Sequence, residues 1–503
     1  METNVRQKSF TRVLSIVLLT VFLFTQTAFA AETASSDAKS MEYLKSVMDM
    51  IKEKYNGQVS DEQLIEGALK GMFNTMDPYT VFFNPSEAEE FLSDVEGTYV
   101  GIGIAMTKAA DDSILISNVF SASPAEKAGL VSGDKIVSVN GKGVAGVSMD
   151  EVVTLVRGQE DTEVVLGVIK NGQSTISTVK VLRAPIKVNP VVYEIRDGIG
   201  YVRIDSFNAN TGEYLEAALK EIDSKNITNV VLDLRNNPGG EVDQAVDVAR
   251  KFVPEGLITK LDYKSEEYRD QQYMSSLKQS KYKLVVLVNE RSASASEILA
   301  GAIQDTKAGT LVGTKTFGKA KVQVLIPMLT SEAYTRYEKQ VGAKILNAYD
   351  LINKYQLSPT NDEVVGWTKI TVGQYTTPKG RMIDQVGLEP DVKVGDYKPV
   401  MDIDVNGIGK LTQTVKPTLN SEGLDVYNAE KILKISGYDI DKPDTKLDEK
   451  TFNAIKKFQK DNGVSPYGVL DFTTQKLMNE KLGKLLLSID LQYAKAVELL
   501  KAN

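Results

Sequence analysis

The chain has 503 residues, a formal net charge of −8, 42% hydrophobic residues and 25% charged residues. Because a single hydrophobic core rarely organises so long a chain, we expect several domains. The sequence contains no cysteine and no histidine, which excludes thiol catalysis, disulfides, cysteine- or histidine-ligated zinc and any Ser-His-Asp triad. Acid–base chemistry therefore falls to Asp, Glu, Lys or Tyr. The acidic balance argues against a nucleic-acid partner, and we expect no metal and no cofactor.

The N-terminus has the pattern of an export signal. Three basic residues among the first twelve precede an apolar run from Val13 to Phe24, and Ala28-Phe29-Ala30 offers a small-x-small cleavage site. The run is shorter than the ~20 apolar residues that cross a bilayer. We therefore predict a signal peptide over residues 1–30 and an extracytoplasmic chain, secreted or, if the signal stays uncleaved, tethered to the membrane.

The next two regions differ in their hydrophobic period. Apolar residues at helical spacing within Met41–Val47 and Leu64–Leu69 predict a helical N-terminal region over residues 37–93. Near Glu96 the pattern changes to short alternating strands, which mark a separate domain over residues 94–184.

Residues 185–398 alternate apolar strands with amphipathic helices. Val230–Arg235 and Leu284–Asn289 are nearly continuous apolar runs, as expected for buried strands of an α/β core. A charged, tyrosine-bearing segment at about residues 330–366 is predicted to be an insertion, with a helix between Glu332 and Tyr355, next to the last strands of this core.

The C-terminal part is predicted to contain three segments. Residues 399–424 are interpreted as a linker, residues 425–482 as a small helical module with its own core, and residues 483–503 as a last amphipathic helix.

Two short motifs carry the candidate chemistry. The strand ending at Asn289 runs into Ser292-Ala293-Ser294-Ala295-Ser296, where a serine at a strand-to-helix junction exposes its hydroxyl to the positive end of the helix dipole. An ordinary serine N-cap explains the same pattern, and three alternate serines leave the nucleophile undecided. Downstream, the glycine-flanked turn Thr316–Lys319 presents a lysine that, once desolvated and neutral, can act as a general base. Ser-Lys pairs are a known alternative to the triad.

The same turn also fits a phosphate-binding loop. Gly313 to Lys319 has the spacing G-x-x-x-x-G-K, but that motif needs a Ser or Thr next and then a helix. Here Ala320 follows and the chain continues as a strand. The nucleotide-binding interpretation is therefore discounted, and added ATP is expected to leave stability unchanged.

The segments Ser292–Gln304, Thr316–Gln323 and Asp233–Gly240 together closely resemble the carboxyl-terminal processing proteases, also called tail-specific proteases, and the resemblance covers nearly the whole mature chain. It implies a crotonase-like α/β serine protease core without metal. It also implies roles for particular residues: Ser294 as nucleophile, Lys319 as base, Gln323 as the group orienting the lysine, Gly239, Gly240 and Ala295 as oxyanion donors, and Glu297 and Asp305 as structural supports.

The strand and glycine order over residues 94–184 resembles the PDZ domain of bacterial proteases, a β-sandwich-like fold. Such a domain adds a peptide strand to a sheet edge and holds its terminal carboxylate on backbone N–H groups. The resemblance assigns Arg157 to a position that connects PDZ occupancy with activation, although a solvated helix-end charge explains it nearly as well. Strand packing is likewise the alternative reason for the glycines. The predicted carboxylate-binding loop comprises Tyr99, Val100, Gly101, Ile102, Gly103 and Ile104.

Residues 425–482 resemble a peptidoglycan-binding module, with Gly437-Tyr438, Phe458-Gln459 and Gly468 on its pattern. The last helix resembles the C-terminal element of the protease itself, so the module is interpreted as an insertion. The implied partners are polypeptides with a free C-terminus and peptidoglycan, and the family resemblance suggests a homodimer.

The leading hypothesis is a multidomain α+β and α/β serine endopeptidase that cleaves exported proteins from or near their C-terminus, with PDZ-mediated recognition or activation. The alternative is an inactive PDZ-bearing scaffold that binds protein tails or cell wall. Arg291 and Ala320 depart from the family, which more often has small residues or glycine there, and Ala320 is expected to affect the turn beside Lys319.

Overall fold

The computed structural model describes residues 39–502 except 109–113, 121, 171–172, 174, 267, 396–399, 404, 406–407 and 414. The predicted signal peptide thus lies outside the described residues. Within the described part of the chain, no helix is long and apolar enough to cross a membrane. The chain divides into two compact units, Met1–Pro85 with Leu325–Ile370, and Ser86–Val324 with Thr371–Asn503.

The first unit joins the N-terminal helices to the predicted insertion. Helix α2 (Asp61–Asn74) begins at a capping box in which Ser60 and Gln63 satisfy each other's backbone N–H groups. Strand β1 (Val81–Phe83) pairs antiparallel with the early part of β18 (Val364–Thr376). The insertion has a small core that includes Leu329, Tyr337 and Leu351. The unit also contains a helix over residues 39–54, α9 (Ser331–Val341), α10 (Ala348–Tyr355) and η1 (Asn361–Glu363).

The single helix predicted between Glu332 and Tyr355 is in fact two helices. Helix α9 ends at Gly342, whose φ of 72° is the left-handed conformation that glycine adopts at no steric cost. The chain then starts α10 at Asn347, whose side chain accepts from the N–H of Tyr349. A glycine stop and a new N-cap therefore break the predicted helix.

The second unit starts with the strand-rich domain predicted over residues 94–184. Its sheet has the order β3-β4-β5-β7-β8, with β6 beside β5, and neighbouring strands run antiparallel. Alternation is clear in β7, where Val164, Leu166 and Val168 are buried. The elements are α3 (Pro85–Glu96), β3 (Ile104–Lys108), β4 (Ile114–Val119), α4 (Pro124–Lys127), β5 (Lys135–Val139), β6 (Lys142–Gly143), α5 (Met149–Val156), β7 (Glu163–Ile169) and β8 (Ile176–Leu182).

The predicted carboxylate-binding loop is in large part a strand. Tyr99, Val100 and Gly101 belong to β2 (Thr98–Gly101), which pairs antiparallel with β9 (Ala184–Lys187). Ile102 and Gly103 form the turn that follows, and Ile104 begins β3. The interpretation of Tyr99–Gly101 as a loop was therefore wrong.

The α/β core predicted over residues 185–398 is built on a six-stranded sheet of order β10-β11-β12-β15-β16-β19. The first pair is antiparallel and the others are parallel. Helices pack on both faces, which explains why its strands are nearly continuous apolar runs. The strands are β10 (Val191–Arg196), β11 (Ile199–Ile204), β12 (Asn229–Asp233), β15 (Lys283–Val288), β16 (Thr310–Gly313) and β19 (Val392–Lys393).

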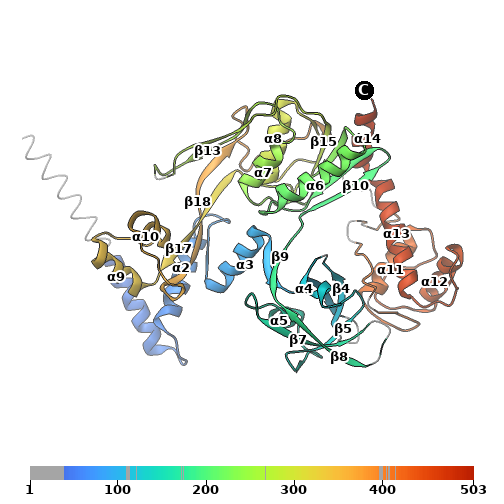
Figure 1. Ribbon diagram of the computed structural model, residues 1–503, viewed down its shortest axis with the longest axis horizontal. Helices are drawn as coiled ribbons and strands as arrows, with labels where there is room; N and C mark the ends of the chain where they lie inside the picture. The colour runs from blue at the N-terminus through green and yellow to red at the C-terminus, as the bar shows by residue number, and fades with distance from the viewer. Residues whose placement is uncertain are drawn as a thin grey trace, which may run out of the picture. The chain divides into compact units, whose positions relative to one another are not determined.

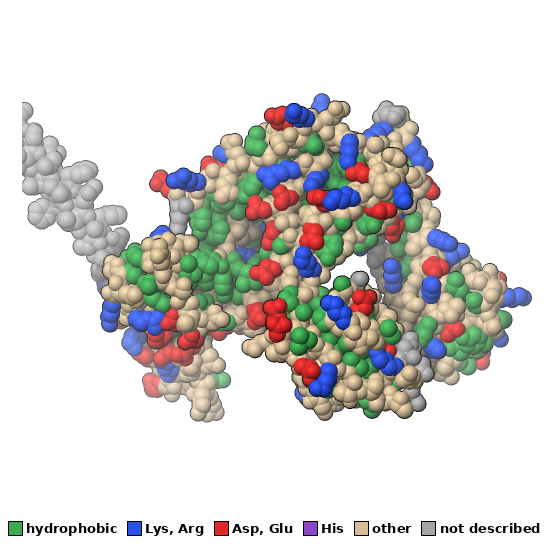
Figure 2. All heavy atoms as spheres, in the orientation of Figure 1, with side chains coloured by type: hydrophobic (Ala, Val, Ile, Leu, Met, Phe, Trp, Pro, Cys, Tyr) green, Lys and Arg blue, Asp and Glu red, His purple; other side chains and the backbone are tan. Residues whose placement is uncertain are grey.

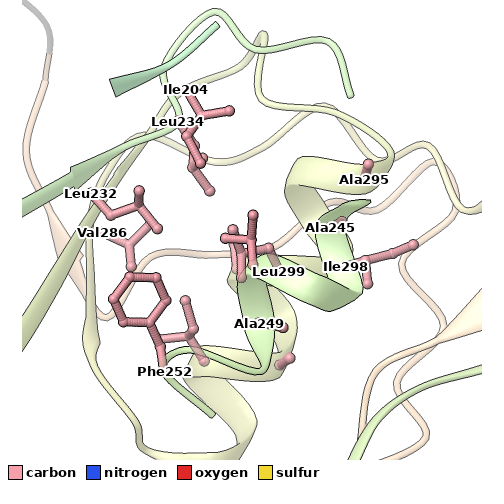
Figure 3. Packing of buried hydrophobic residues seen from close by; sticks show 14 of the residues in the cluster. Ile204, Leu232, Leu234, Ala245, Ala249, Phe252, Val286, Ala295, Ile298 and Leu299 are labelled. Carbon is pink, nitrogen blue, oxygen red and sulfur yellow. The ribbon is translucent and has the colours of Figure 1, made fainter. Parts of the chain in front are cut away.

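One face of this sheet is covered by α6 (Thr211–Ser224), α7 (Val242–Ala249) and α8 (Ala295–Thr306). Leu299 of α8 lies on the side of its helix that faces the strands carrying Leu232 and Val286 (Figure 3). The other face is covered by α14 (Leu491–Lys501), which lies along β15 in Figure 1 and packs Ala496 and Leu500 on Val285 and Leu287. The C-terminal helix is therefore part of the protease core.

A second, smaller sheet adjoins the candidate site. Strand β13 (Gly256–Tyr263) pairs with β14 (Gln271–Ser275) and with the Gly373–Thr376 end of β18 (Val364–Thr376), and β18 also pairs with β17 (Lys321–Leu329).

The C-terminal module consists of α11 (Leu424–Ile435), α12 (Glu449–Asp461) and α13 (Phe472–Ile489) around its own core. The preceding segment, interpreted as a linker, places Ile403, Val405 and Leu411 in that core. These buried side chains tie the segment to the module.

Charged groups tie α14 to the core sheet. The Arg235 guanidinium, just after β12, pairs with Asp233 at 2.6 Å and with Asp490, the N-cap of α14, at 2.9 Å. Asp233 also accepts from the Tyr201 hydroxyl at 2.8 Å. Since all three charged side chains are nearly buried, removing one would leave uncompensated charge.

Candidate active site

Ser294 occupies a sharp turn between β15 and α8. Its φ of 55° and ψ of −116° fall in a region that L-residues rarely adopt. Strained strand-to-helix turns of this kind project a serine hydroxyl away from the sheet. Ser294 is partly exposed and directly precedes the first helical residue, Ala295.

The two neighbouring serines are structural. Ser292 and Ser296 are fully buried. The Ser292 hydroxyl donates to the carbonyl of Leu234 at 2.8 Å, and the Ser296 hydroxyl donates to the carbonyl of Asn237 at 3.0 Å. Both hydroxyl protons are therefore used in hydrogen bonds to the segment that follows β12. The fold thus distinguishes Ser294 from the two serines that the sequence alone could not exclude as the nucleophile.

The turn carrying Lys319 is held on several sides. Gly318 has a φ of 92°, and a Cβ there would lie 2.8 Å from the backbone nitrogen of Gly387. Ala320 is buried, and its N–H donates to Asp384 at 3.1 Å. The turn therefore accommodates an alanine where the family more often has glycine, and it leaves Lys319 partly buried.

Glu297, on the first turn of α8, connects the serine to the lysine turn. One carboxylate oxygen, Oε2, accepts from the N–H of Ser294 at 3.0 Å and of Lys319 at 2.8 Å. The other, Oε1, accepts from the Thr316 hydroxyl at 2.6 Å and the Gly318 N–H at 2.8 Å. Burial raises the pKa of Glu297, and these hydrogen bonds oppose the rise.

Tyr375, near the end of β18, reaches the same two residues from their carbonyl side. Its hydroxyl lies 2.9 Å from the carbonyl oxygen of Ser294 and 2.6 Å from that of Lys319. Sequence reasoning missed this residue, because a tyrosine in a strand carries no local signal of a site.

Two other predicted residues, Gln323 and Asp305, contact groups on or just after β18. The side-chain amide of Gln323, on β17, donates to the Thr371 hydroxyl of β18 at 3.3 Å. Asp305, at the far end of α8, is buried and pairs with Arg381 at 2.7 Å. It also accepts from the N–H of Lys379 at 2.9 Å. Asp305 therefore anchors the chain after β18 and does not line the serine turn.

The predicted oxyanion loop lies against the serine turn, and both of its glycines are sterically required. A Cβ on Gly239 would lie 2.8 Å from the Cβ of Ser294 and 3.0 Å from the nitrogen of Ala295, and one on Gly240 would lie 2.2 Å from the Phe207 carbonyl oxygen. The N–H of Gly239, however, donates to Asn237 Oδ1 at 2.9 Å. Gly239 therefore gives the loop its close approach, and its N–H has an acceptor within the loop, so its role as an oxyanion donor stays a prediction.

Two arginines of the PDZ domain, Arg157 and Arg183, lie at the C-terminal end of α5. Arg157, the C-cap of α5, is exposed and lies over the Tyr99 ring, with its guanidinium carbon 4.8 Å from the ring centroid. Arg183 is buried between β8 and β9 and donates to the carbonyls of Val156 at 2.8 Å and Leu155 at 3.1 Å. The end of α5 is thus attached to Tyr99 of β2 and to Arg183, which directly precedes β9.

Gly103 has a packing role. Its φ is 78°, and a Cβ there would lie 2.3 Å from the Cβ of Ser123. This contact matches the alternative that the sequence left open for the glycines of the loop.

Comparison with known proteins gives four family matches. They are peptidase family S41 over residues 198–394, a PDZ domain over 115–170, the activating protease CtpB N-terminal domain over 24–86, and a putative peptidoglycan binding domain over 422–478.

Full-length relatives agree. The chain is 32% identical over 492 residues to the carboxy-terminal processing protease CtpA of Bacillus subtilis, covering 96% of this chain and 95% of the relative. It is 30% identical to CtpB of the same organism, covering 91% and 89%. Among solved structures, the photosystem II D1 C-terminal processing protease is 28% identical over 69% of this chain and 86% of that one, with a TM-score of 0.37.

The chain therefore belongs to the carboxy-terminal processing proteases of peptidase family S41. It is a serine-type peptidase that acts on polypeptides, and PDZ and peptidoglycan-binding domains accompany its protease core. The predicted family, fold class and enzyme class are confirmed.

Proposed function

We propose that this chain is an endopeptidase with a Ser-Lys dyad, in which Ser294 is the nucleophile, Lys319 the general base and Gln323 the residue that orients the lysine. The observation that carries the proposal is the shared anchoring of the two residues. Both donate a backbone N–H to one oxygen of Glu297, so residues from separate turns meet at one point.

The chemistry follows from this arrangement. Neutral Lys319 takes the proton of the Ser294 hydroxyl as the oxygen attacks the peptide carbonyl. The oxyanion forms beside the N-terminus of α8, where the N–H groups of Gly240 and Ala295 supply the donors. Lys319 then protonates the leaving amine, and an acyl-enzyme remains. Water, deprotonated by Lys319, hydrolyses the acyl-enzyme and restores the serine.

The base must be neutral to act. Lys319 is partly buried, and desolvation disfavours the charged ammonium form. Because the chain has no histidine, no imidazole competes for the role.

Substrate selection is assigned to the PDZ domain. Capture of a C-terminal carboxylate beside β3 places a peptide strand near α5. Arg157 and Arg183 attach the end of α5 to the β2–β9 ribbon, which leads into the protease core. A peptide that displaces α5 therefore changes the ribbon, and we propose that this couples binding to activation.

The proposed substrates are exported proteins with a free C-terminus, cleaved outside the cytoplasm after removal or retention of the N-terminal signal. The peptidoglycan-binding domain fits a location near the cell wall, and the homodimer suggested by the family stays a prediction. Acidic and basic side chains are intermixed on the face shown in Figure 2, so that face carries no basic stripe for a phosphate backbone.

The test replaces Ser294 with Ala and, separately, Lys319 with Ala, and follows cleavage of casein. Each variant should lose at least ~10⁴-fold in kcat while keeping its fold, since removal of a nucleophile or its base disables the whole unit. Full activity of Ser294→Ala would refute the dyad. Wild-type protein that binds C-terminal peptides without cleaving them would instead support the scaffold.

Activity of the wild-type enzyme should rise toward alkaline pH as Lys319 loses its proton. An acid optimum would point to a carboxylate base.

A further inference from the structure

We propose that Tyr375 is a positioning residue for the dyad: its hydroxyl holds the backbone carbonyls of Ser294 and Lys319 together and so fixes the separation of nucleophile and base. The inference rests on the proposed function, because it assigns a role relative to those two residues.

The position of Tyr375 is set by the sheet rather than by the site. It lies on β18, where it pairs with Leu261 of β13, and its N–H donates to the carbonyl of Ala320 at 3.0 Å. Its side chain is 1% exposed and belongs to the main core cluster. The phenol therefore approaches the site from a rigid, buried support.

The hydroxyl has one proton and faces two carbonyl oxygens. The bond to Lys319 is the shorter, at 2.6 Å against 2.9 Å for Ser294. The Ser294 carbonyl also accepts from the N–H groups of Glu297 and Ile298 in the first turn of α8. The shared proton thus joins a carbonyl fixed by a helix to the carbonyl of the lysine turn.

Tyr375 and Glu297 contact the same two residues, Ser294 and Lys319, through different backbone groups. Glu297 receives both backbone N–H groups on one oxygen, and Tyr375 meets both carbonyls with one hydroxyl. The backbone of Ser294, with a φ of 55°, is strained and persists only where its surroundings hold it in place. With Glu297 alone, nothing would hold the Lys319 carbonyl at the Ser294 carbonyl, which the first turn of α8 already fixes.

The Tyr375 hydroxyl also keeps its proton at the alkaline pH that a neutral lysine base requires. Burial raises the pKa of Tyr375 well above its ordinary value, and the charges of Glu297 and Asp384 raise it further. The phenol therefore keeps its proton in the alkaline range where a lysine becomes neutral.

A matched control comes from Tyr282, another buried tyrosine of the same core cluster. Its hydroxyl donates to Asp223 at 2.9 Å, at a strand start remote from the serine turn. The changes Tyr375→Phe and Tyr282→Phe each remove one hydroxyl and leave a ring in place, so they separate positioning from loss of a buried hydrogen bond.

The experiment measures kcat, KM, the pH profile and the melting temperature of full-length Tyr375→Phe, Tyr282→Phe and Ser294→Ala. Tyr375→Phe should lose ~10²-fold in kcat, the scale of a 1 Å misplacement of reacting groups, with KM unchanged. Its melting temperature should fall no further than that of Tyr282→Phe, whose kcat should equal that of the wild type. The alkaline midpoint of activity should be the same in all active forms.

The inference is overturned if Tyr375→Phe keeps the kcat of Tyr282→Phe, or if its pH midpoint moves while the plateau is preserved, since Tyr375 would then be carrying a proton. These outcomes differ from failure of the dyad, which would appear as retained activity in Ser294→Ala. Should Tyr375→Phe not fold, Tyr375→4-aminophenylalanine restores a donor at the same place. That variant should keep near wild-type kcat, and a folded but inactive form would also overturn the inference.

Discussion

Replacing Glu297 with glutamine tests whether its carboxylate holds the backbone of Ser294 and of the Lys319 turn in place. Glu297→Gln preserves shape and exchanges one acceptor oxygen for an NH₂ group. Each oxygen of the Glu297 carboxylate accepts two hydrogen bonds. The NH₂ group of glutamine cannot accept a hydrogen bond, so the two donors on that side would lose their acceptor.

The expected loss of stability follows from those bonds. Two lost hydrogen bonds to a buried charged acceptor cost about 1.5–3 kcal/mol each. Replacing a buried carboxylate with a neutral amide returns part of that, because burial disfavours the charged form, as the raised pKa of Glu297 indicates. We therefore expect the free energy of unfolding to fall by roughly 2–4 kcal/mol.

Catalysis should fall further than stability accounts for. If the amide nitrogen replaces Oε2, the N–H groups of Ser294 and Lys319 both lose their acceptor, and kcat should decrease by ~10² or more with KM unchanged. Urea unfolding followed by circular dichroism, and casein cleavage under folding conditions, measure the two effects. The control is Glu221→Gln on the surface of α6, expected within ~0.5 kcal/mol of the wild type. Equal stability and kcat in the two variants would refute the reasoning.

The same carboxylate predicts how acid inactivates the enzyme. Its pKa is raised by burial, so just above pH 4.5 the folded chain binds this proton more readily than the unfolded chain. This group's contribution to stability therefore increases as pH falls through its folded pKa and is lost as pH rises. The neutral carboxyl nevertheless accepts fewer bonds, so activity should disappear while the protein is still folded. Activity and ellipticity that fall together on acidification would exclude Glu297 as the cause.

Three further outcomes are expected. Ser292→Ala and Ser296→Ala should each lower the free energy of unfolding by about 1 kcal/mol in urea titrations and retain casein cleavage; loss of activity in a folded variant would question the assignment of Ser294. Arg235→Ala should cost about 3–5 kcal/mol, because it leaves two buried carboxylates without their partner, whereas Lys495→Ala, which removes a partly exposed side chain of α14, should cost under ~0.5 kcal/mol; equal costs would show that the network is solvated. Arg157→Ala should reduce cleavage of protein substrates without changing the melting temperature, and unchanged cleavage would leave it a surface charge.

Much of the fold could be predicted because its signals are local. Continuous apolar strands such as Leu284–Asn289 predicted a sheet covered on both faces, and the last amphipathic helix does pack on that sheet as α14. The failures arose where a local pattern has two outcomes. Nothing in the sequence of Tyr99–Gly101 distinguishes a loop from an edge strand until β9, far along the chain, pairs with it.

For the site, the amino-acid sequence by itself determined the chemistry that is possible. Without histidine or cysteine, a serine peptidase must use a lysine, a carboxylate or a tyrosine as its base, and the two motifs supplied one serine run and one lysine turn. Those conclusions need only residue types and spacing.

Only the tertiary structure decided which candidate donors of the site are already hydrogen-bonded to other groups. Ser292 and Ser296 are occupied by carbonyls of a different strand end, and the N–H of Gly239 is occupied by Asn237. Tyr375 reaches the site from β18. Hydrogen-bond partners distant in sequence leave no local pattern, so only the fold distinguishes Ser294 from its two neighbours and brings the backbone N–H groups of Ser294 and Lys319 to one oxygen of Glu297.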